Sequence, residues 1–307
     1  MELEQIFTEA LEYGRQSIPQ GQVATYIPEL AKADPSWLSV CAVTTDLQSY
    51  AYGDCTQKFT LQSIAKVISL ILALETVGED VVFQKVGMEP TGDPFNSIVK
   101  LEKVSTHTPY NPMINAGAIS VASNIPGANL EERFDAFLRF TRKICGNEEI
   151  SLSFETYLSE KRTGDRNRAL AYMMKSGGVL EGSVEEHLDL YFMICSVLAT
   201  CRDIAFLGAV LANNGVHPVT GEPLIGPRHL KIVRSLMVTC GMYDASGYFA
   251  TMVGLPSKSG VGGGIVSVVP NVMGIGVFGP ALDERGNSIG GVKILEYLSD
   301  RLNLSIF

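Results

Sequence analysis

Segments with the pattern of β-strands lie near both ends of the chain, whereas the middle has the pattern of helices. Alternating and β-branched residues predict strands at 38–44 and 48–52. After residue 250, runs bounded by Gly and Pro predict three more strands, at 251–255, 264–269 and 272–278. Strands from opposite ends of a chain share one sheet only if those ends meet in space, so this distribution restricts the possible folds more than any other feature.

Between these strands, apolar residues spaced by three and four predict helices at 129–145, 166–176 and 183–200. Further helices are predicted at 202–213 and 288–302, and the first thirty residues suggest a helix broken near Pro19. We therefore expect an α+β fold in which a mixed sheet, flanked by helices, is built from both termini and carries an inserted all-helical domain.

The expected boundaries follow from the same pattern. Residues 1–65 and 201–307 form the predicted sheet domain, and residues 66–200 form the predicted helical domain. An active site is expected where the two meet, because ligand sites favour domain interfaces.

Composition excludes several classes of partner. The 307 residues are 46% hydrophobic and 19% charged, which is typical of a soluble protein with a substantial core. The net charge of −9 argues against nucleic acid or an anionic membrane as a partner, because both are polyanions. The acidic N-terminal segment lacks the features of a secretory signal, and the longest apolar run, residues 67–74, is too short to cross a bilayer. We therefore expect a cytoplasmic protein.

The cysteines and histidines do not form a familiar metal-binding pattern. None of the six cysteines pairs as Cys-x-x-Cys, and the four histidines are scattered. We expect no metal site, and we expect most of the cysteines to be buried free thiols in a reducing compartment.

Two short motifs resemble known functional signatures but lack the required context. Residues 274–279 (GIGVFG) fit the dinucleotide pattern GxGxxG, yet they lie in a predicted strand instead of opening a helix. We interpret these glycines as allowing close packing in a sheet. Residues 286–290 (GNSIG) fit the nucleophile elbow, but no histidine follows His229, so Ser288 is predicted to cap the last helix.

The pattern Ser-x-x-Lys occurs twice, as Ser63/Lys66 and as Ser97/Lys100. The second pair has charged neighbours, so Lys100 is predicted to be solvated. The first pair begins a helix whose other residues are almost all apolar, and its spacing puts both side chains on one face. A desolvated ammonium there would favour its neutral form and could activate the hydroxyl as a nucleophile. The alternative is a snorkelling lysine beside a capping serine.

A second motif favours catalysis. Lys258-Ser259-Gly260 begins the C-terminal strands and resembles the Lys-Thr-Gly strand that accompanies Ser-x-x-Lys in β-lactamases and penicillin-binding proteins. An edge strand at this place would supply a backbone N–H to an oxyanion, and small residues would let a substrate approach. The alternative is a simple glycine-rich turn.

With both motifs in this order, the chain resembles the serine-dependent glutaminase family, which has the β-lactamase/transpeptidase-like fold. The resemblance runs from residue 23 to the last helix. It is carried by FTLQSIAKV (59–67), NPMINAGAI (111–119), TGDRNRALAYMMKS (163–176), CGMYDASGYFA (240–250) and LPSKSGVGGGIVSVVP (255–270). It implies hydrolysis of L-glutamine to L-glutamate and ammonia without metal or cofactor.

The resemblance also implies a role for each site residue. Ser63 would be the nucleophile and Lys66 its activating partner, with the Tyr243 and Tyr26 hydroxyls assisting. The implied substrate contacts are the side chains of Gln62, Asn115, Glu160, Asn167, Tyr191 and Tyr243 and the oxyanion-binding N–H groups of Ser63 and Val261. A carboxylate can pair with the substrate ammonium, and amides can donate to its carboxylate.

Two other functions remain open at this point. A β-lactamase or peptidase could use the same residues, but such enzymes act outside the cytoplasm. A non-catalytic amino-acid binder would not need Ser63, Lys66 and Tyr243 together. As partners we expect the small molecule L-glutamine and further copies of the chain in a dimer or tetramer, the latter implied by the family resemblance alone.

Overall fold

The computed structural model describes residues 2–92, 97–98, 101 and 107–307. Its main sheet has five strands in the order β2-β1-β8-β7-β6, and every neighbouring pair is antiparallel. The strands are β1 (Ser39–Thr44), β2 (Ser49–Gly53), β6 (Ser257–Ser259), β7 (Gly264–Val269) and β8 (Met273–Phe278). The pairing of β1 with β8 joins the two ends of the chain, as the sequence predicted.

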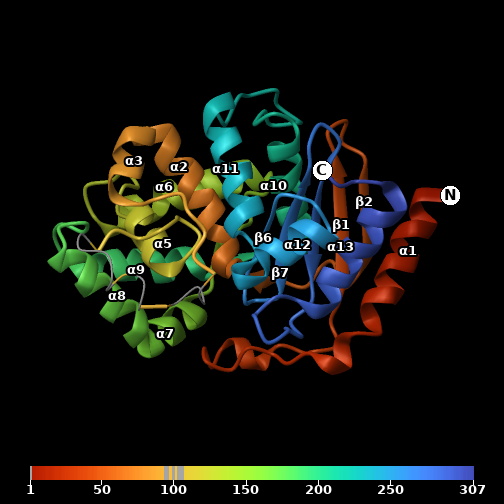
Figure 1. Ribbon diagram of the computed structural model, residues 1–307, viewed down its shortest axis with the longest axis horizontal. Coiled ribbons are helices and arrows are strands. Elements are labelled where there is room, and N and C mark those ends of the chain that lie inside the picture. Colours follow the sequence, from red (N-terminus) through yellow and green to blue (C-terminus); the bar gives the residue numbers. More distant parts are fainter. Residues whose placement is uncertain (1, 93–96, 99–100, 102–106) are drawn as a thin grey trace.

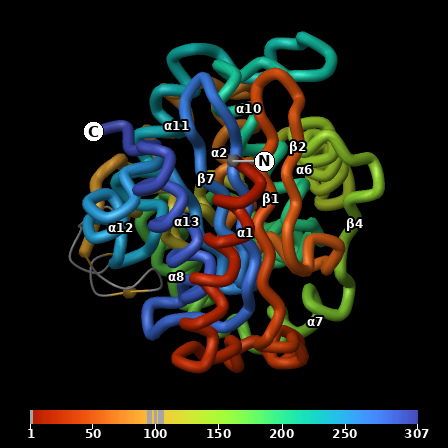
Figure 2. Tube along the Cα trace, turned by 90° about the vertical axis from the view of Figure 1, so that its right-hand side faces the viewer, coloured from red at the N-terminus to blue at the C-terminus, as the bar shows by residue number. Residues whose placement is uncertain are grey.

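Helices cover both faces of this sheet. Along β1, Val40 and Ala42 pack with α1 (Glu2–Arg15) and α13 (Ile289–Leu302), because successive side chains of a strand point to opposite faces. Cys41 and Val43 pack on the other face, in the core that contains α10 (Cys201–Ala212). Helices α1 and α13 lie side by side, although they come from opposite ends of the chain (Figure 2).

Glycines in β8 let α10 lie directly on the sheet. A Cβ at Gly274 would come within 2.0 Å of the Ala209 nitrogen, and one at Gly276 within 2.3 Å of the Cys201 carbonyl oxygen. The GIGVFG motif is therefore a packing feature inside a strand, as predicted. The serine of the second motif, Ser288, accepts a hydrogen bond from the Gly291 N–H and caps α13, which also confirms its prediction.

The middle of the chain forms a group of helices beside the sheet, at the opposite side of the molecule from α1 (Figure 1). These helices are α2 (Ala65–Val77), α3 (Glu79–Lys85), α5 (Asn115–Ala122), α6 (Leu130–Cys145), α7 (Phe154–Thr163), α8 (Asp165–Ser176) and α9 (Val184–Cys195). Every residue of α2 from Ala65 to Leu74 is buried, which explains why its sequence is apolar on all sides. Helix α2 packs against α5 and α6 of the group and against α11 (Pro227–Cys240), so it is covered on several sides.

Capping side chains explain where several helices begin. Asn129, Ser153, Ser183 and Thr200 each accept a hydrogen bond from a backbone N–H in the first turn of the following helix. Gly146 ends α6 in the left-handed conformation, as its sequence position indicated. The local signals for these helices agree with the tertiary structure.

Two predicted segments are wrong. The helix expected at 183–200 ends at Cys195, because Val197–Ala199 form β5, which pairs with β3 (Phe59–Thr60) and β4 (Ser151–Leu152). The strand expected at 251–255 is instead the end of α12 (Ser246–Met252) and the turn after it. Short β-branched runs fit either element, and here pairing partners far along the chain decide between them.

Helix α11 was not predicted from the sequence. Short 3₁₀ helices also occur: η1 (Ile18–Gln20), η2 (Leu30–Lys32), η3 (Gln62–Ile64) and η4 (Tyr243–Ala245). Within the described ranges, none of the helices combines the length and apolar character needed to cross a bilayer. The domain boundaries proposed from the sequence stay a prediction.

The close contact of β8 with α10 generates a test. We expect Gly274→Ala to lower the free energy of unfolding by about 1–3 kcal/mol, because the added methyl group would overlap the α10 backbone. The matched control is Gly247→Ala: beyond its own helix, none of the described atoms lies within 4 Å of the position that the methyl group would take, and alanine favours a helix. Thermal and denaturant unfolding measure both; equal stability of the two variants would contradict this account.

Candidate active site

Ser63 lies in η3, directly before α2, where the chain passes the edge of the main sheet. The edge strand β6 ends at Ser259, and Gly260 lies against the Ser63 segment: a Cβ at Gly260 would be 2.7 Å from the Leu61 carbonyl oxygen and 3.4 Å from the Ser63 nitrogen. A Cβ at Gly262 would be 2.6 Å from the Thr60 carbonyl oxygen. Gly260 of the Lys-Ser-Gly motif and the nearby Gly262 therefore allow two backbone segments to touch where the serine is exposed to a pocket.

Lys66 is buried, with 1% of its surface exposed. Its Nζ donates to Asn115 Oδ1 at 2.7 Å and to the Met113 carbonyl oxygen at 3.2 Å. Burial lowers the pKa of Lys66 to about 8, against the opposing influence of Cys195 and Glu160. A neutral amine is thus accessible near physiological pH. The other Ser-x-x-Lys pair is not comparable, because Lys100 lies outside the described residues.

One pocket gathers eight of the residues named from the sequence. Its lining includes Tyr26, Gln62, Ser63, Asn115, Glu160, Asn167, Tyr191 and Val261. Tyr26 is 54% exposed, whereas Tyr191 is only 4% exposed. The residues come from widely separated parts of the chain, and the fold alone brings them together.

Glu160 is a buried carboxyl group in this pocket. Its Oε1 accepts a hydrogen bond from Gln62 Nε2 at 2.7 Å. Burial raises the pKa of Glu160 to about 7, although the Gln62 hydrogen bond and the charge of Lys66 oppose this shift. Gln62 reaches the carboxyl group from a backbone with φ of 48°, an uncommon conformation for a residue other than glycine.

The two asparagines extend a hydrogen-bonded chain from Lys66 across the pocket. Asn115 accepts from Lys66 through Oδ1, and its Nδ2 donates to Asn167 Oδ1 at 3.0 Å. The Asn167 amide group therefore keeps its own N–H donors for another partner. This arrangement couples the position of both amides to the buried lysine.

Tyr243 does not line this pocket, but its side chain is close enough to Ser63 for that residue to influence the pKa of its hydroxyl group. Burial raises the pKa of Tyr243, while the nearby Ser63 side chain opposes the increase. Tyr243 also has a positive φ, of 56°. The Nζ of buried Lys258 lies 4.5 Å from the centre of its ring, and burial together with the nearby Lys66 holds the Lys258 pKa well below its usual range.

The pocket also contains residues that were not predicted from the sequence. They are Ile27, Thr163, Gly164 and Cys195. Cys195 follows Tyr191 by four residues on α9, so helical spacing could have identified it. Over the described part of the chain, no three His, Cys, Asp or Glu side chains are grouped so as to hold a metal ion.

The sheet shared by both termini, the helices inserted into it and the Ser-x-x-Lys helix beside a Lys-Ser-Gly edge strand define the β-lactamase/transpeptidase-like fold class. Comparison with known proteins narrows this class. The family model described as Glutaminase matches residues 21–307. A glutaminase of Clostridium botulinum is 56% identical over 306 residues, covering 99% of this chain and 100% of the relative.

Solved structures agree with the sequence comparison. The crystal structure of a probable glutaminase of Bacillus subtilis has a TM-score of 0.92 and 40% identity, and the match covers 98% of this chain and 96% of that one. A covalent complex of a Bacillus subtilis glutaminase with 5-oxo-L-norleucine has a TM-score of 0.88 and 39% identity, covering 97% and 98% of the two chains. The chain belongs to the glutaminase family, and the fold and family predicted from its sequence are confirmed.

The raised pKa of Glu160 generates a stability test. Because the folded-state pKa lies above the ordinary value of 4.5, wild-type stability is lost as pH rises from about 4.5 through about 7. We expect Glu160→Gln to be more stable than wild type at pH 8, by about 1–3 kcal/mol, and the advantage to vanish at pH 4. Denaturant unfolding at both pH values measures this, with the exposed Glu148→Gln as the control for loss of one charge. An advantage independent of pH would refute the assigned cause.

Proposed function

We propose that the chain hydrolyses L-glutamine to L-glutamate and ammonia through a glutamyl-enzyme formed on Ser63. The observation that carries this proposal is one pocket whose lining combines Ser63, a buried carboxyl group and the amides of Gln62, Asn115 and Asn167. The related Bacillus subtilis glutaminase forms a covalent complex with 5-oxo-L-norleucine after reaction with 6-diazo-5-oxo-L-norleucine, which supports a nucleophile in this family.

In the first step, Ser63 Oγ attacks the side-chain carboxamide carbon of glutamine while neutral Lys66 accepts the hydroxyl proton. The lowered pKa of Lys66 supports its role as the base. The resulting oxyanion accepts hydrogen bonds from the backbone N–H groups of Ser63 and Val261. The apposition of Gly260 to Ser63 supports this arrangement, because it brings the Val261 segment beside the nucleophile.

Collapse of this intermediate breaks the C–N bond, and the leaving nitrogen takes a proton to depart as ammonia. Tyr243 and protonated Lys66 are the proposed donors, and the closeness of the Tyr243 and Ser63 side chains supports the former. Water then attacks the glutamyl ester, giving up its proton to the same base and releasing glutamate and the Ser63 hydroxyl. The Tyr26 hydroxyl, at the pocket wall, is proposed to assist these transfers. These steps use only side chains, backbone and water.

The other polar groups are proposed to bind the amino-acid head of the substrate. Glu160, held by Gln62, would pair with the α-ammonium group, which would favour its ionised form. Asn115 and Asn167 would donate to the α-carboxylate, since Asn167 retains N–H donors for it. The Tyr191 hydroxyl would complete the head site from α9.

The protein's domain organisation, cellular location and oligomeric state are also part of the proposal. We place the site between a sheet domain (1–65 and 201–307) and a helical domain (66–200), a division supported by the pocket, which residues of both line. A cytoplasmic location is supported by six free cysteines. A homo-oligomer is supported by exposed apolar side chains on and beside α3, among them Val81 and Met88, at 41% and 43% exposure.

Replacing the nucleophile tests the proposal directly. We expect Ser63→Ala to reduce ammonia release from L-glutamine by a factor on the order of 10³ or more, because no acyl-enzyme can form. Ser69→Ala is the matched control: this buried serine lies on α2, six residues after Ser63, and donates to the Lys66 carbonyl oxygen rather than to a pocket group, so its variant should retain activity.

Three experimental outcomes would contradict the proposed function or its mechanism. Equal activity of wild type and Ser63→Ala would remove Ser63 from the mechanism. Turnover of a cephalosporin without turnover of glutamine would favour a β-lactamase or peptidase. Binding of glutamine without turnover by the wild type would favour an amino-acid binder.

The pH dependence tests the roles of Lys66 and Glu160. Lys66 becomes neutral as pH rises through about 8, and Glu160 becomes ionised as pH rises through about 7, so kcat/KM should increase between pH 6 and pH 8.5. Lys66→Arg should abolish activity, since a guanidinium stays charged. Steady-state kinetics across this range measure the effect, and a wild-type profile that falls from pH 6 to pH 8.5 would contradict the proposed base.

A further inference from the structure

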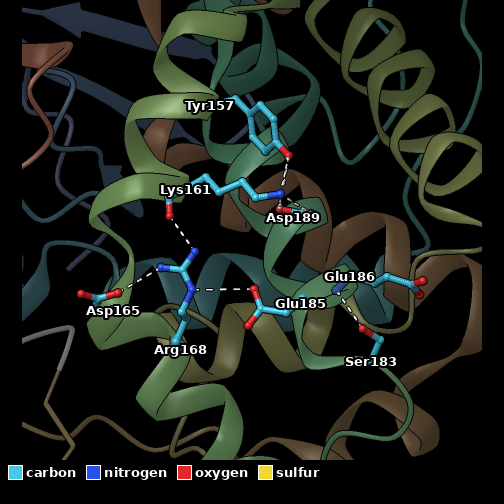
Figure 3. A network of polar contacts seen from close by, with 8 residues as sticks. All are labelled: Tyr157, Lys161, Asp165, Arg168, Ser183, Glu185, Glu186 and Asp189. Carbon is cyan, nitrogen blue, oxygen red and sulfur yellow. Dashed lines mark hydrogen bonds and ion pairs between the residues drawn. The ribbon is translucent and has the colours of Figure 1, made fainter.

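A group of polar side chains, none of which lines the pocket, connects α7, α8 and α9. Figure 3 shows this group. The same three helices carry three of the residues proposed to bind the substrate head: Glu160 on α7, Asn167 on α8 and Tyr191 on α9. We call the group the three-helix network. Its members are Tyr157, Lys161, Asp165, Arg168, Glu185 and Asp189.

The first part of the network joins α7 to α9. Lys161 Nζ forms an ion pair with Asp189 Oδ1 at 2.7 Å, and the Tyr157 hydroxyl donates to the same carboxylate at 3.2 Å (Figure 3). Lys161 directly follows Glu160, and Asp189 precedes Tyr191 by two residues. This ion pair lies within one helical turn of Glu160 on α7 and within one turn of Tyr191 on α9. It therefore fixes the distance between the two helices near these residues.

The second part is Arg168, which contacts all three helices. Its Nη2 donates to the Lys161 carbonyl oxygen at 2.6 Å, near the end of α7, and its Nε lies 3.7 Å from Glu185 Oε2 on α9. Its Nη1 also bonds Asp165 Oδ1, at 3.2 Å, in the first turn of its own helix. Arg168 directly follows Asn167. The segment of α8 that carries the Asn167 amide is therefore connected to α7 and α9 through the Arg168 side chain.

The junction of α7 and α8 leaves little freedom for these contacts to shift. Only Gly164 separates the two helices, and a Cβ there would come within 2.4 Å of the Phe192 ring on α9. The guanidinium satisfies a carbonyl group that the end of α7 would otherwise leave to solvent. A lost Arg168 contact would be transmitted to Glu160 and Asn167 through the rigid helix backbone.

We propose that Arg168 and the Lys161–Asp189 pair are positioning residues that set the affinity for the amino-acid head of the substrate. This inference rests on the proposed function of the pocket. None of the three side chains lines that pocket, so each acts through its neighbour on the same helix. Misplacement of polar groups by a fraction of an ångström weakens binding strongly, whereas partly exposed ion pairs contribute little to global stability.

The exposure of these side chains supports a local role. The Asp189 and Arg168 side chains are 17% and 26% exposed, and the Lys161 side chain is 39% exposed. Water and salt screen such pairs, so the loss of one pair should hardly move the unfolding midpoint. A substitution here should change substrate affinity more than it changes the unfolding transition.

The central test is Arg168→Gln, with Arg162→Gln as the matched control. Arg162 is an exposed residue near the end of α7, and its substitution makes the same change in charge. We expect Arg168→Gln to raise KM for L-glutamine roughly tenfold, with kcat within about twofold of wild type, because the head is held less well while Ser63 is undisturbed. Arg162→Gln should change neither constant.

A second ligand separates positioning from general damage. Glutaramate has the carboxylate and carboxamide of glutamine but lacks the α-ammonium group, so it cannot pair with Glu160. Calorimetric binding to the Ser63→Ala protein, with and without Arg168→Gln, compares the two ligands without chemistry. We expect Arg168→Gln to weaken glutamine binding more than glutaramate binding, and an equal loss for both ligands would overturn the inference.

The binding experiment also separates the two proposals. If the Ser63→Ala protein binds glutamine and Arg168→Gln does not change the affinity, the positioning role fails and the proposed function stands. If Ser63→Ala alone binds no glutamine, the proposed function fails, and the inference fails with it.

Exchange of charges tests the α7–α9 pair independently. Lys161→Asp and Asp189→Lys should each raise KM, because each places like charges together. The double variant restores an ion pair in the reverse direction and should recover most of the lost affinity. Effects of the single variants that simply add in the double variant would exclude a role of the pair.

Discussion

The buried ammonium group of Lys66 is the interaction on which the rest of the site depends. Neutral acceptors hold its Nζ: the Asn115 side-chain oxygen and the Met113 carbonyl oxygen. Burial lowers the pKa of Lys66 to about 8, because these neutral acceptors compensate a buried charge less than a carboxylate would, so a neutral amine is accessible near physiological pH. The same contact fixes Asn115, and through it Asn167, so one lysine connects the proposed chemistry with the proposed binding of the substrate.

The two sides of Ser63 differ in their physical character: the sheet side is closely packed backbone, and the helical side contains a buried carboxyl group. On the sheet side, Gly260 and Gly262 allow backbone to touch backbone, which is what an oxyanion site made of N–H groups requires. On the helical side, Glu160 is buried beside Gln62 at the cost of a raised pKa, which an incoming ammonium group would reverse. The pocket therefore presents a small group of preorganised polar groups to a charged ligand.

The helices that carry the groups proposed to bind the substrate head are held by contacts outside the pocket. Arg168 and the Lys161–Asp189 pair lie one or two residues from Asn167, Glu160 and Tyr191, and they bind neighbouring helices. A site composed of side chains from separate helices needs such support, because each helix could otherwise shift without losing its own hydrogen bonds. The three-helix network provides this support with solvent-accessible groups that have little effect on the core.

The sequence by itself determined the elements whose signals are local. Periodicity and caps predicted helices such as α6 and α13, the two strand groups indicated a sheet from both termini, and the family resemblance identified eight of the twelve residues that line the pocket. Only the tertiary structure decided that 197–199 is a strand, that 251–255 is not, and that Gly164 lines the pocket. It also decided the pKa values of Lys66 and Glu160. The physical reason is that strand pairing and desolvation depend on neighbours distant in sequence, whereas helix periodicity and capping depend on residues within one turn.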